Sequence, residues 1–421
     1  MYRERDLPIC LAARFLTEIA ALAQSVAIGW TVYLRSHTAL SLGLVGLAQF
    51  VPMMILMLPA GELCDRLHPR RILSAGLAIQ ALCAAALFAL ARGATTPLWW
   101  LYPVLMLSGA ARALAEPAEQ ALLPFLVPAE RLPRAIAWSS SLWQLAVIAG
   151  PAFGGIAYAL GAAGVYAMCA AAFLAAALAV MTVAGRPVAR VRSATLGERL
   201  ALVAEGLRFV RSEPILLGAI SLDLVAVLLG GATALLPIYA RDILHVGPIG
   251  LGVLRSAPAI GACATALYQV RHPPARAVGF KLFAAVAAFG IATVVFALST
   301  SLALSLAALA AVGATDMVSV NIRASLMQLA TPDALRGRVA AVNMLFIGTS
   351  NELGAFESGL LAALIGAVPA VVVGGFGAQI TAGLWMRLFP TLRRADRLVA
   401  RSVDLQNQMV GQPAGPRVER P

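Results

Sequence analysis

Hydrophobic residues in this chain form long continuous runs rather than the short alternating patterns of a soluble domain. An α-helix rises about 1.5 Å per residue, so roughly 20 apolar residues cross some 30 Å of hydrocarbon. Twelve runs meet this length: 9–34, 40–62, 71–91, 97–123, 135–160, 163–184, 214–240, 248–270, 277–298, 302–329, 338–362 and 367–389. Arg14 and Glu18 interrupt the first run, which argues against a cleaved signal peptide. We therefore predict twelve membrane-spanning helices.

Composition supports a membrane protein and removes several function classes. Hydrophobic residues make up 60% of the chain and charged residues 12%, about half the charged fraction of a soluble domain. The five cysteines show no CxxC spacing, and the four histidines form no metal-binding or catalytic motif. The single lysine, Lys281, lies outside any phosphate-binding loop. We expect neither an enzyme nor a bound metal or cofactor.

Basic residues indicate the orientation of the chain. With both termini in the cytoplasm, 25 of the 32 basic residues fall on the cytoplasmic side, and four lie within the runs. Only Arg35, Arg92 and Arg241 fall outside, which is a strong positive-inside bias. The net charge of +12 is therefore mainly a property of the cytoplasmic face, and it indicates no nucleic-acid partner.

The second half of the chain repeats the first. An offset of 204 residues aligns Pro128 with Pro332 and Gly155 with Gly359, among other matches. The repeat predicts two parallel six-helix halves, an architecture found among transporters. We assign residues 1–184 and 214–389 to the halves, 185–213 to a cytoplasmic linker and 390–421 to a tail. Within the linker, apolar residues at helical spacing predict an amphipathic helix on the inner membrane surface, or a simple tether: Leu196, Leu200, Val203, Leu207 and Val210.

The loop between the second and third runs reads GELCDRLHPRR, from Gly61 to Arg71. It resembles the signature loop of the major facilitator superfamily, with matches at Gly61, Asp65, Arg66, Arg70 and Arg71. His68-Pro69 replaces the turn glycine of that family. The resemblance implies an all-α membrane protein of twelve helices in two pseudo-symmetric bundles. It also implies a cytoplasmic gate, in which Asp65 approaches Gly337 when the inside is closed. The alternative is a basic signal that only fixes topology.

A second motif, GPAFGG, lies in the fifth run and contains Gly150, Pro151, Gly154 and Gly155. It resembles the core of the antiporter motif of the same family, although small residues also serve simple helix packing. The surrounding sequence ALLPFLVPAERLPRAIA resembles the branch of the family that includes the enterobactin exporter and multidrug-efflux proteins. SNELGAFESG and its preceding residues in the eleventh run fit the same branch.

Charged residues within the runs are the candidates for function, because a charge in a bilayer is costly and faces a protein interior or a cavity. These residues are Arg14, Glu18, Arg112, Glu116, Asp223, Asp316 and Glu352. Spacings of four residues predict local ion pairs of Arg14 with Glu18 and of Arg112 with Glu116. The repeat also relates Arg112 to Asp316, and Glu119 to Arg323, with the charges reversed. This reversal suggests pairs across a central cavity, although Glu119 and Arg323 also fit a purely structural pair.

A buried carboxylic acid can bind and release protons near neutral pH. We expect the proton carrier to be Glu352, Asp223 or Asp316, with Arg14 and Arg112 balancing the charge of the cavity. Aromatic and polar residues on the expected cavity helices suit amphipathic solutes: Gln24, Trp30, Tyr102, Trp138, Trp143, Gln144 and Asn343. The predicted function is proton-coupled export of small amphipathic compounds or siderophores across a bacterial inner membrane. A symporter or facilitator that imports, and a non-transporting sensor or scaffold, are the alternatives. No obligate protein partner is indicated.

Overall fold

The computed structural model describes residues 5–93, 96–183, 196–274 and 276–395, and every regular element within them is helical. The first half contains six long helices: α1 (Asp6–Ser36), α2 (Ala39–Arg66), α3 (Pro69–Arg92), α4 (Leu101–Leu126), α5 (Leu132–Ala157) and α6 (Gly161–Thr182). Single 3-10 turns precede or follow three of them: η1 (Leu98–Trp100), η2 (Ala129–Arg131) and η3 (Tyr158–Leu160). The first half is thus a six-helix bundle.

The second half repeats this order after a separate helix, α7 (Leu196–Ser212). Its elements are α8 (Pro214–Leu229), η4 (Ala232–Leu235), α9 (Leu236–Ile238), η5 (Tyr239–Ile243), α10 (Gly247–Arg271), α11 (Val278–Leu298), α12 (Leu302–Ala330), η6 (Asp333–Leu335), α13 (Arg336–Ile365), α14 (Ala367–Leu388) and α15 (Pro390–Arg393). The segments from α8 to η5 together form the seventh span.

Ten stretches of the described residues are long and apolar enough to cross a membrane. One of them, Ala129–Thr182, contains both α5 and α6. The 30-residue helix α13 lies outside the ten and carries four charged residues: Arg336, Arg338, Glu352 and Glu357. With α5 and α6 separated and α13 included, the fold is the predicted all-α membrane protein of twelve spans in two bundles.

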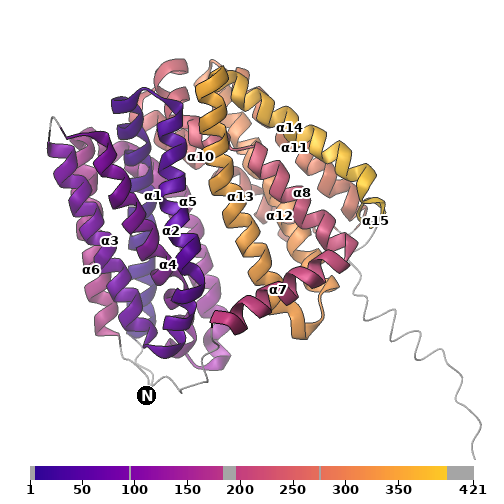
Figure 1. Ribbon diagram of the computed structural model, residues 1–421, viewed down its shortest axis with the longest axis horizontal. Helices are drawn as coiled ribbons and strands as arrows, with labels where there is room; N and C mark the ends of the chain where they lie inside the picture. Colours follow the sequence, from indigo (N-terminus) through magenta and orange to yellow (C-terminus); the bar gives the residue numbers. More distant parts are fainter. Residues whose placement is uncertain (1–4, 94–95, 184–195, 275, 396–421) are drawn as a thin grey trace, which may run out of the picture.

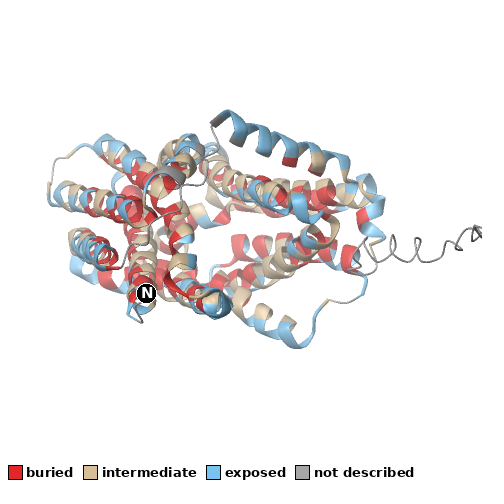
Figure 2. Ribbon diagram, turned by 90° about the horizontal axis from the view of Figure 1, so that it is seen from below, coloured by how far each residue is buried: buried red, intermediate tan, exposed pale blue. Residues whose placement is uncertain are grey.

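The two bundles have the same internal packing. In the first, α3 packs on α6, α2 on α4 and α1 on α5; in the second, α11 packs on α14, α10 on α12 and α8 on α13. Each pair therefore has an equivalent in the other half, as the repeat predicts. Figure 1 shows the bundles side by side, and Figure 2 shows buried residues gathered between the helices of each bundle.

Glycines allow the bundles to approach each other closely along two helix pairs. A β-carbon on Gly155 of α5 would lie 2.5 Å from the carbonyl oxygen of Pro248 and 3.1 Å from Cα of Gly252, in α10. A β-carbon on Gly359 of α13 would lie 2.8 Å from Cα of Gly43 in α2. These separations leave no room for a side chain, so the helices touch through their backbones. Gly155 and Gly359 are the pair that the repeat aligns.

The bundles are joined at one end of the molecule. We call this the apical end, where α1 finishes at Ser36, and the opposite end the basal end, where α1 starts at Asp6. At the apical end Tyr33 Oη donates a hydrogen bond to Asp242 Oδ2. The neighbouring Arg241 lies 3.0 Å, Nη1 to Nδ1, from His37, and its guanidinium is 5.7 Å from the centre of the Tyr33 ring.

At the basal end the inner faces are less covered. A β-carbon on Gly337, at the start of α13, would meet no atom within 4 Å, and Met344 in the next turns is 58% exposed. Figure 1 shows α13 and α12 diverging from the first bundle towards this end. The side-chain contacts that join the bundles therefore lie at the apical end, whereas the start of α13 is exposed at the basal end.

The seventh span is interrupted, which the hydrophobic run 214–240 did not predict. The helix α8 ends at Leu229, and a 3-10 turn, a short helical turn and a π-helical turn follow. A β-carbon on Gly231 would lie 2.4 Å from the carbonyl oxygen of Gly354 in α13. The break thus occurs where the chain passes directly against the backbone of α13.

The predicted linker helix is α7, and part of its apolar face is covered by protein. Val203, Leu207 and Val210 pack with Val339 and Val342 of α13, whereas Leu200 is 50% exposed. An ion pair between Glu205 and Arg338 also joins α7 to α13. The remaining linker residues 184–195 and the tail from residue 396 lie outside the described residues.

Candidate functional site

A cavity of about 210 Å³ lies between the two bundles. The first bundle contributes residues of α1 and α2, and the second contributes residues of η4, α9, α10 and α13. The lining residues are Ser25, Gly29, Leu42, Val45, Gly46, Thr233, Ala234, Pro237, Arg255, Asn351, Glu352 and Ala355. The lining thus mixes polar and apolar surface about equally, and it includes one arginine and one carboxylate.

Arg255 of α10 extends towards the first bundle. Its Nη1 donates a hydrogen bond of 2.7 Å to Ser25 Oγ in α1. Arg255 is one of the four basic residues within the predicted spans, but no motif or spacing in the sequence assigned it a role. Its position alone indicated a role, since an arginine in the middle of an apolar run has a high free-energy cost in the bilayer unless it faces a partner or a cavity.

Glu352 of α13 reaches the same cavity from the other side. Its Oε2 would lie 3.1 Å from a β-carbon on Gly46 of α2, so the missing side chain at Gly46 leaves room for the carboxylate. The positive charges that act on Glu352 are those of Arg112 and Arg255. The aromatic and polar residues predicted to face the cavity do not line it: Gln24, Trp30, Tyr102, Trp138, Trp143, Gln144 and Asn343. Gln24 and Trp30 are buried within the protein instead.

In the first bundle the predicted pair of Arg14 with Glu18 is replaced by a pair between helices. Arg14 Nε of α1 lies 3.0 Å from Glu119 Oε1 of α4, and Arg14 Nη1 donates a 2.6 Å hydrogen bond to Ser139 Oγ of α5. Packing of α4 and α5 against α1 brings these acceptors within reach, so Arg14 turns away from its own helix. Glu119 is therefore part of the charged network of this half.

The predicted pair of Arg112 with Glu116 is present within α4, with Nη2 and Oε1 3.0 Å apart. These two residues line a second cavity, of about 140 Å³, inside the first bundle. Glu18, Gln80 and Glu119 line the same cavity. The acids of this half thus gather around one enclosed polar space.

In the second bundle Asp223 of α8 forms an ion pair with Arg323 of α12, and both residues are buried. The prediction that charge-reversed positions pair across the central cavity is wrong for this pair, because the partner of Arg323 lies in its own bundle. The reason is that α8 and α12 are neighbours within the second bundle, as α1 and α4 are within the first.

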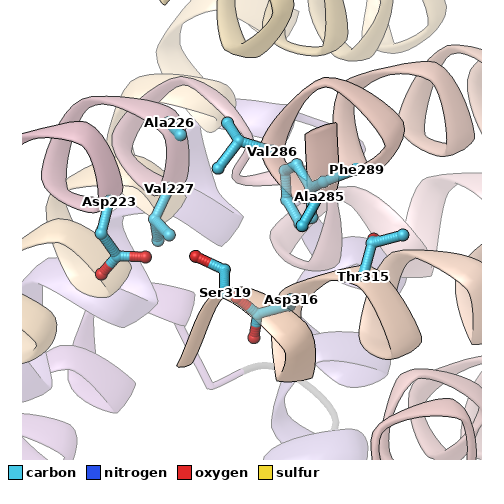
Figure 3. Close-up of a pocket in the computed structure, with 9 residues that line it drawn as sticks. All are labelled: Asp223, Ala226, Val227, Ala285, Val286, Phe289, Thr315, Asp316 and Ser319. Atoms are coloured by element: carbon cyan, nitrogen blue, oxygen red, sulfur yellow. The ribbon is translucent and has the colours of Figure 1, made fainter. Parts of the chain in front are cut away.

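Asp316 of α12 lies beside this pair. Asp223, Asp316 and Ser319 line one small pocket, which Figure 3 shows with the two carboxylates on opposite helices. Within the part of the chain that the structure describes, Asp316 has no ion-pair partner within 4.0 Å. Asp223 is therefore the paired acid of this pocket and Asp316 the unpaired one.

The gate loop connects α2 to α3 at the basal end. His68 precedes α3 and Pro69 is its first residue, so the His-Pro pair forms the turn. Arg70 Nη1 donates a hydrogen bond to the carbonyl oxygen of Val183, after α6, while Arg71 is exposed. The side chains of Asp65 and Arg66 lie outside the described residues. The open space at Gly337 agrees with a basal end that is not closed.

The glycines of the helix-5 motif are contact points. A β-carbon on Gly154 would lie 2.6 Å from Cα of Ala23, and one on Gly150 would lie 2.8 Å from Cβ of Leu22, both in α1. Gly155 faces α10, and the carbonyl oxygen of Pro151 would lie 2.5 Å from a β-carbon on Gly252. The motif therefore packs α5 against α1 on one side and against the other bundle on the other.

Among the described residues, no group of three or more His, Cys, Asp or Glu side chains is arranged to hold a metal ion.

Comparisons with known proteins agree with this arrangement. The sequence model of a family described as transmembrane secretion effectors matches residues 3–416. The enterobactin exporter of Citrobacter koseri is 27% identical over 91% of this chain and 91% of its own length. The multidrug efflux pump Tap of Mycolicibacterium fortuitum is 31% identical over 80% of this chain and 84% of its own length. A POT family transporter solved with a thioalcohol-conjugated peptide has the same fold, with a TM-score of 0.73 at 10% identity over 92% of this chain and 96% of its own.

Proposed function

The chain belongs to the transmembrane secretion effector family of the major facilitator superfamily, whose members are membrane transporters and not enzymes, and we propose that it is an exporter. Its proposed solutes are small amphipathic organic compounds, siderophores included, and its proposed mechanism is alternating access. The observation that carries this proposal is the cavity between the bundles, which combines apolar walls with Arg255 and Glu352. Such a mixture suits a solute with an apolar body and a polar group. Export rather than import is supported by the two similar proteins, which are an exporter and an efflux pump.

The basal end is the cytoplasmic end in this proposal. Basic residues gather there in the first turns of three helices, at Arg70, Arg71, Arg134 and Arg336. A transporter open at this end can load a solute from the cytoplasm. Release on the other side then requires the apical contacts, such as Tyr33 to Asp242, to separate.

Protons are the proposed coupling ion and Glu352 the proposed carrier. Of the three acids expected from the sequence, Glu352 is the one that lines the cavity between the bundles. Asp223 is held by Arg323, and Asp316 lies inside the second bundle. A carboxylate at the interface of the bundles is placed to exchange its proton with either side as the bundles rock.

The proposed function is tested by accumulation of fluorescent amphiphiles and siderophores in cells with and without the protein. We expect lower accumulation in cells that contain it, and we expect both a protonophore and the gate variant Asp65→Asn to abolish the difference. Equal accumulation of every compound with and without the protein would contradict the proposal. Higher accumulation would instead identify an importer.

The proton carrier is tested by Glu352→Gln, with Glu357→Gln as the matched control on the same helix. Glu357 lies more than a turn further towards the apical end and outside the cavity lining. We expect the Glu352 variant to lose export driven by a pH gradient while the Glu357 variant retains it. Full pH-driven export by Glu352→Gln would remove Glu352 as the carrier.

A further inference from the structure

Arg255 differs from the other arginines inside the spans. Arg14 is paired with Glu119, Arg112 with Glu116, and Arg323 with Asp223. Within the described residues, no carboxylate lies within 4.0 Å of the Arg255 guanidinium, which donates a hydrogen bond to the neutral hydroxyl of Ser25. A hydroxyl satisfies one donor and carries no charge, so the negative charge that acts on Arg255 is that of Glu352, which lines the same cavity without forming an ion pair with it.

A guanidinium that is not directly bonded to a carboxylate is costly away from water, because the protein interior replaces hydration poorly. Arginine carries five N–H donors in a planar fork, and among the described residues only Ser25 accepts a hydrogen bond from this fork. The residue lines the cavity between the bundles, so the remaining donors have a space in which a ligand can meet them. The fork matches the paired oxygens of a carboxylate or of a similar acidic oxygen group.

We propose that Arg255 is the anion receptor of the cavity, so that the compounds it selects are amphipathic solutes with a carboxylate or a similar acidic oxygen group. This inference rests on the proposed export function, whose solute class it narrows. The volume of about 210 Å³ is below the range of roughly 300–1,000 Å³ that holds a whole drug-sized ligand. The cavity therefore accommodates the acidic end of the solute, with Leu42, Val45 and Pro237 against its apolar part.

Binding to the purified protein tests the proposal with naphthoate, naphthamide and naphthylmethylammonium, which share one ring system and differ in charge. We expect naphthoate to bind the wild-type protein at least about tenfold more tightly than the other two, since charge-assisted hydrogen bonds are the strong ones. Arg255→Gln should weaken naphthoate binding by about tenfold or more and leave naphthamide unchanged. Arg255→Lys should retain part of the preference.

The matched control is Arg92→Gln, which removes an exposed arginine that stacks on Phe88 at the end of α3, remote from the cavity. We expect it to bind naphthoate as the wild-type protein does. A second measurement needs no variant: phenylglyoxal modifies arginine side chains, and naphthoate should protect Arg255 but not Arg92, as read by peptide mass spectrometry. This keeps the test decisive if Arg255→Gln does not fold.

The proposal is overturned if the three probes bind equally, if Arg255→Gln binds naphthoate normally, if naphthoate fails to protect Arg255, or if no probe binds. Export from cells separates this failure from that of the proposed function. Continued export of neutral or cationic dyes by the wild-type protein would leave the export function standing while Arg255 loses its role. If the wild-type protein neither binds naphthoate nor exports any dye, both the anion-receptor proposal and the export proposal are wrong.

Discussion

Glu119 of α4 and Arg323 of α12 occupy equivalent positions in the two halves of the chain and carry opposite charges. Each pairs with the first helix of its own bundle, Glu119 with Arg14 of α1 and Arg323 with Asp223 of α8. The same connection is thus made twice with the charges exchanged. An ion pair joins equivalent helices in both halves although the charges are exchanged, which indicates that the pairs hold neighbouring helices of one bundle together.

The buried pair of the second bundle gives a direct prediction. Arg323→Gln leaves the Asp223 carboxylate buried without its cation, and we expect this to lower the free energy of unfolding by about 3 kcal/mol. The double variant Asp223→Arg with Arg323→Asp has the charge order of the first bundle and should recover at least half of that loss. Thermal unfolding in detergent, followed by circular dichroism, measures both. Arg336→Gln, which breaks an exposed pair with Asp333, serves as the control and should leave the unfolding temperature unchanged.

Gly155 tests the role of the backbone contact between bundles. A valine there would place its β-carbon 2.5 Å from the carbonyl oxygen of Pro248, so α5 and α10 must separate. We expect Gly155→Val to widen the apical end, measured as a longer distance between spin labels at Arg35 and His245. Gly383→Val is the control, since a β-carbon at Gly383 meets no atom within 4 Å. An unchanged label distance in the Gly155 variant would show that this contact does not set the closure.

Much of the fold could be predicted because hydrophobic length alone decides where a membrane helix lies. The ninth run, predicted at 277–298, is α11, Val278–Leu298. The break after Leu229 was not predicted from the length of the run 214–240, although Gly230, Gly231 and Pro237 within it weaken a helix. The contact of Gly231 with Gly354, in a distant segment, could not be predicted from the sequence.

The charged residues of the site were found from the sequence, but their partners were not. Spacing of four residues predicted the Arg112–Glu116 pair correctly, since both lie on one helix face. It failed for Arg14, because a long side chain selects among all neighbouring helices and the sequence does not say which helices are neighbours. Arg255 was visible as a charge inside an apolar run, yet only the structure shows that no described carboxylate forms an ion pair with it and that it lies in one cavity with Glu352.

The contact of α7 with α13 includes both an ion pair and close backbone packing, and two variants test these contributions separately. Glu205 and Arg338 form a partly exposed pair, and such pairs contribute about 1 kcal/mol or less, so Glu205→Gln should change little. Gly206→Val should release the helix, because its β-carbon would lie 2.7 Å from the carbonyl oxygen of Arg338. Hydrogen exchange of residues 196–212 measures the difference. We expect faster exchange in the Gly206→Val variant than in the Glu205→Gln variant, and the reverse result would contradict the prediction.

Tyr33 and Asp242 are predicted to control opening of the apical end. Tyr33→Phe removes the donor of the hydrogen bond between the bundles, and the loss of one bond to a charged group shifts a two-state equilibrium by roughly 1.5 kcal/mol or more, about tenfold.

This shift can be measured with a cysteine at Thr233, which lines the cavity and reacts with an impermeant maleimide from outside only when the apical end is open. We expect Tyr33→Phe to raise the labelling rate by severalfold above that of the cysteine variant alone, after subtraction of labelling in protein without the added cysteine. Thr38→Ala removes a hydroxyl that is bonded to Ser41 within the first bundle and should not change the rate. An unchanged rate in the Tyr33 variant would mean that the glycine contacts, rather than this hydrogen bond, hold the apical end closed.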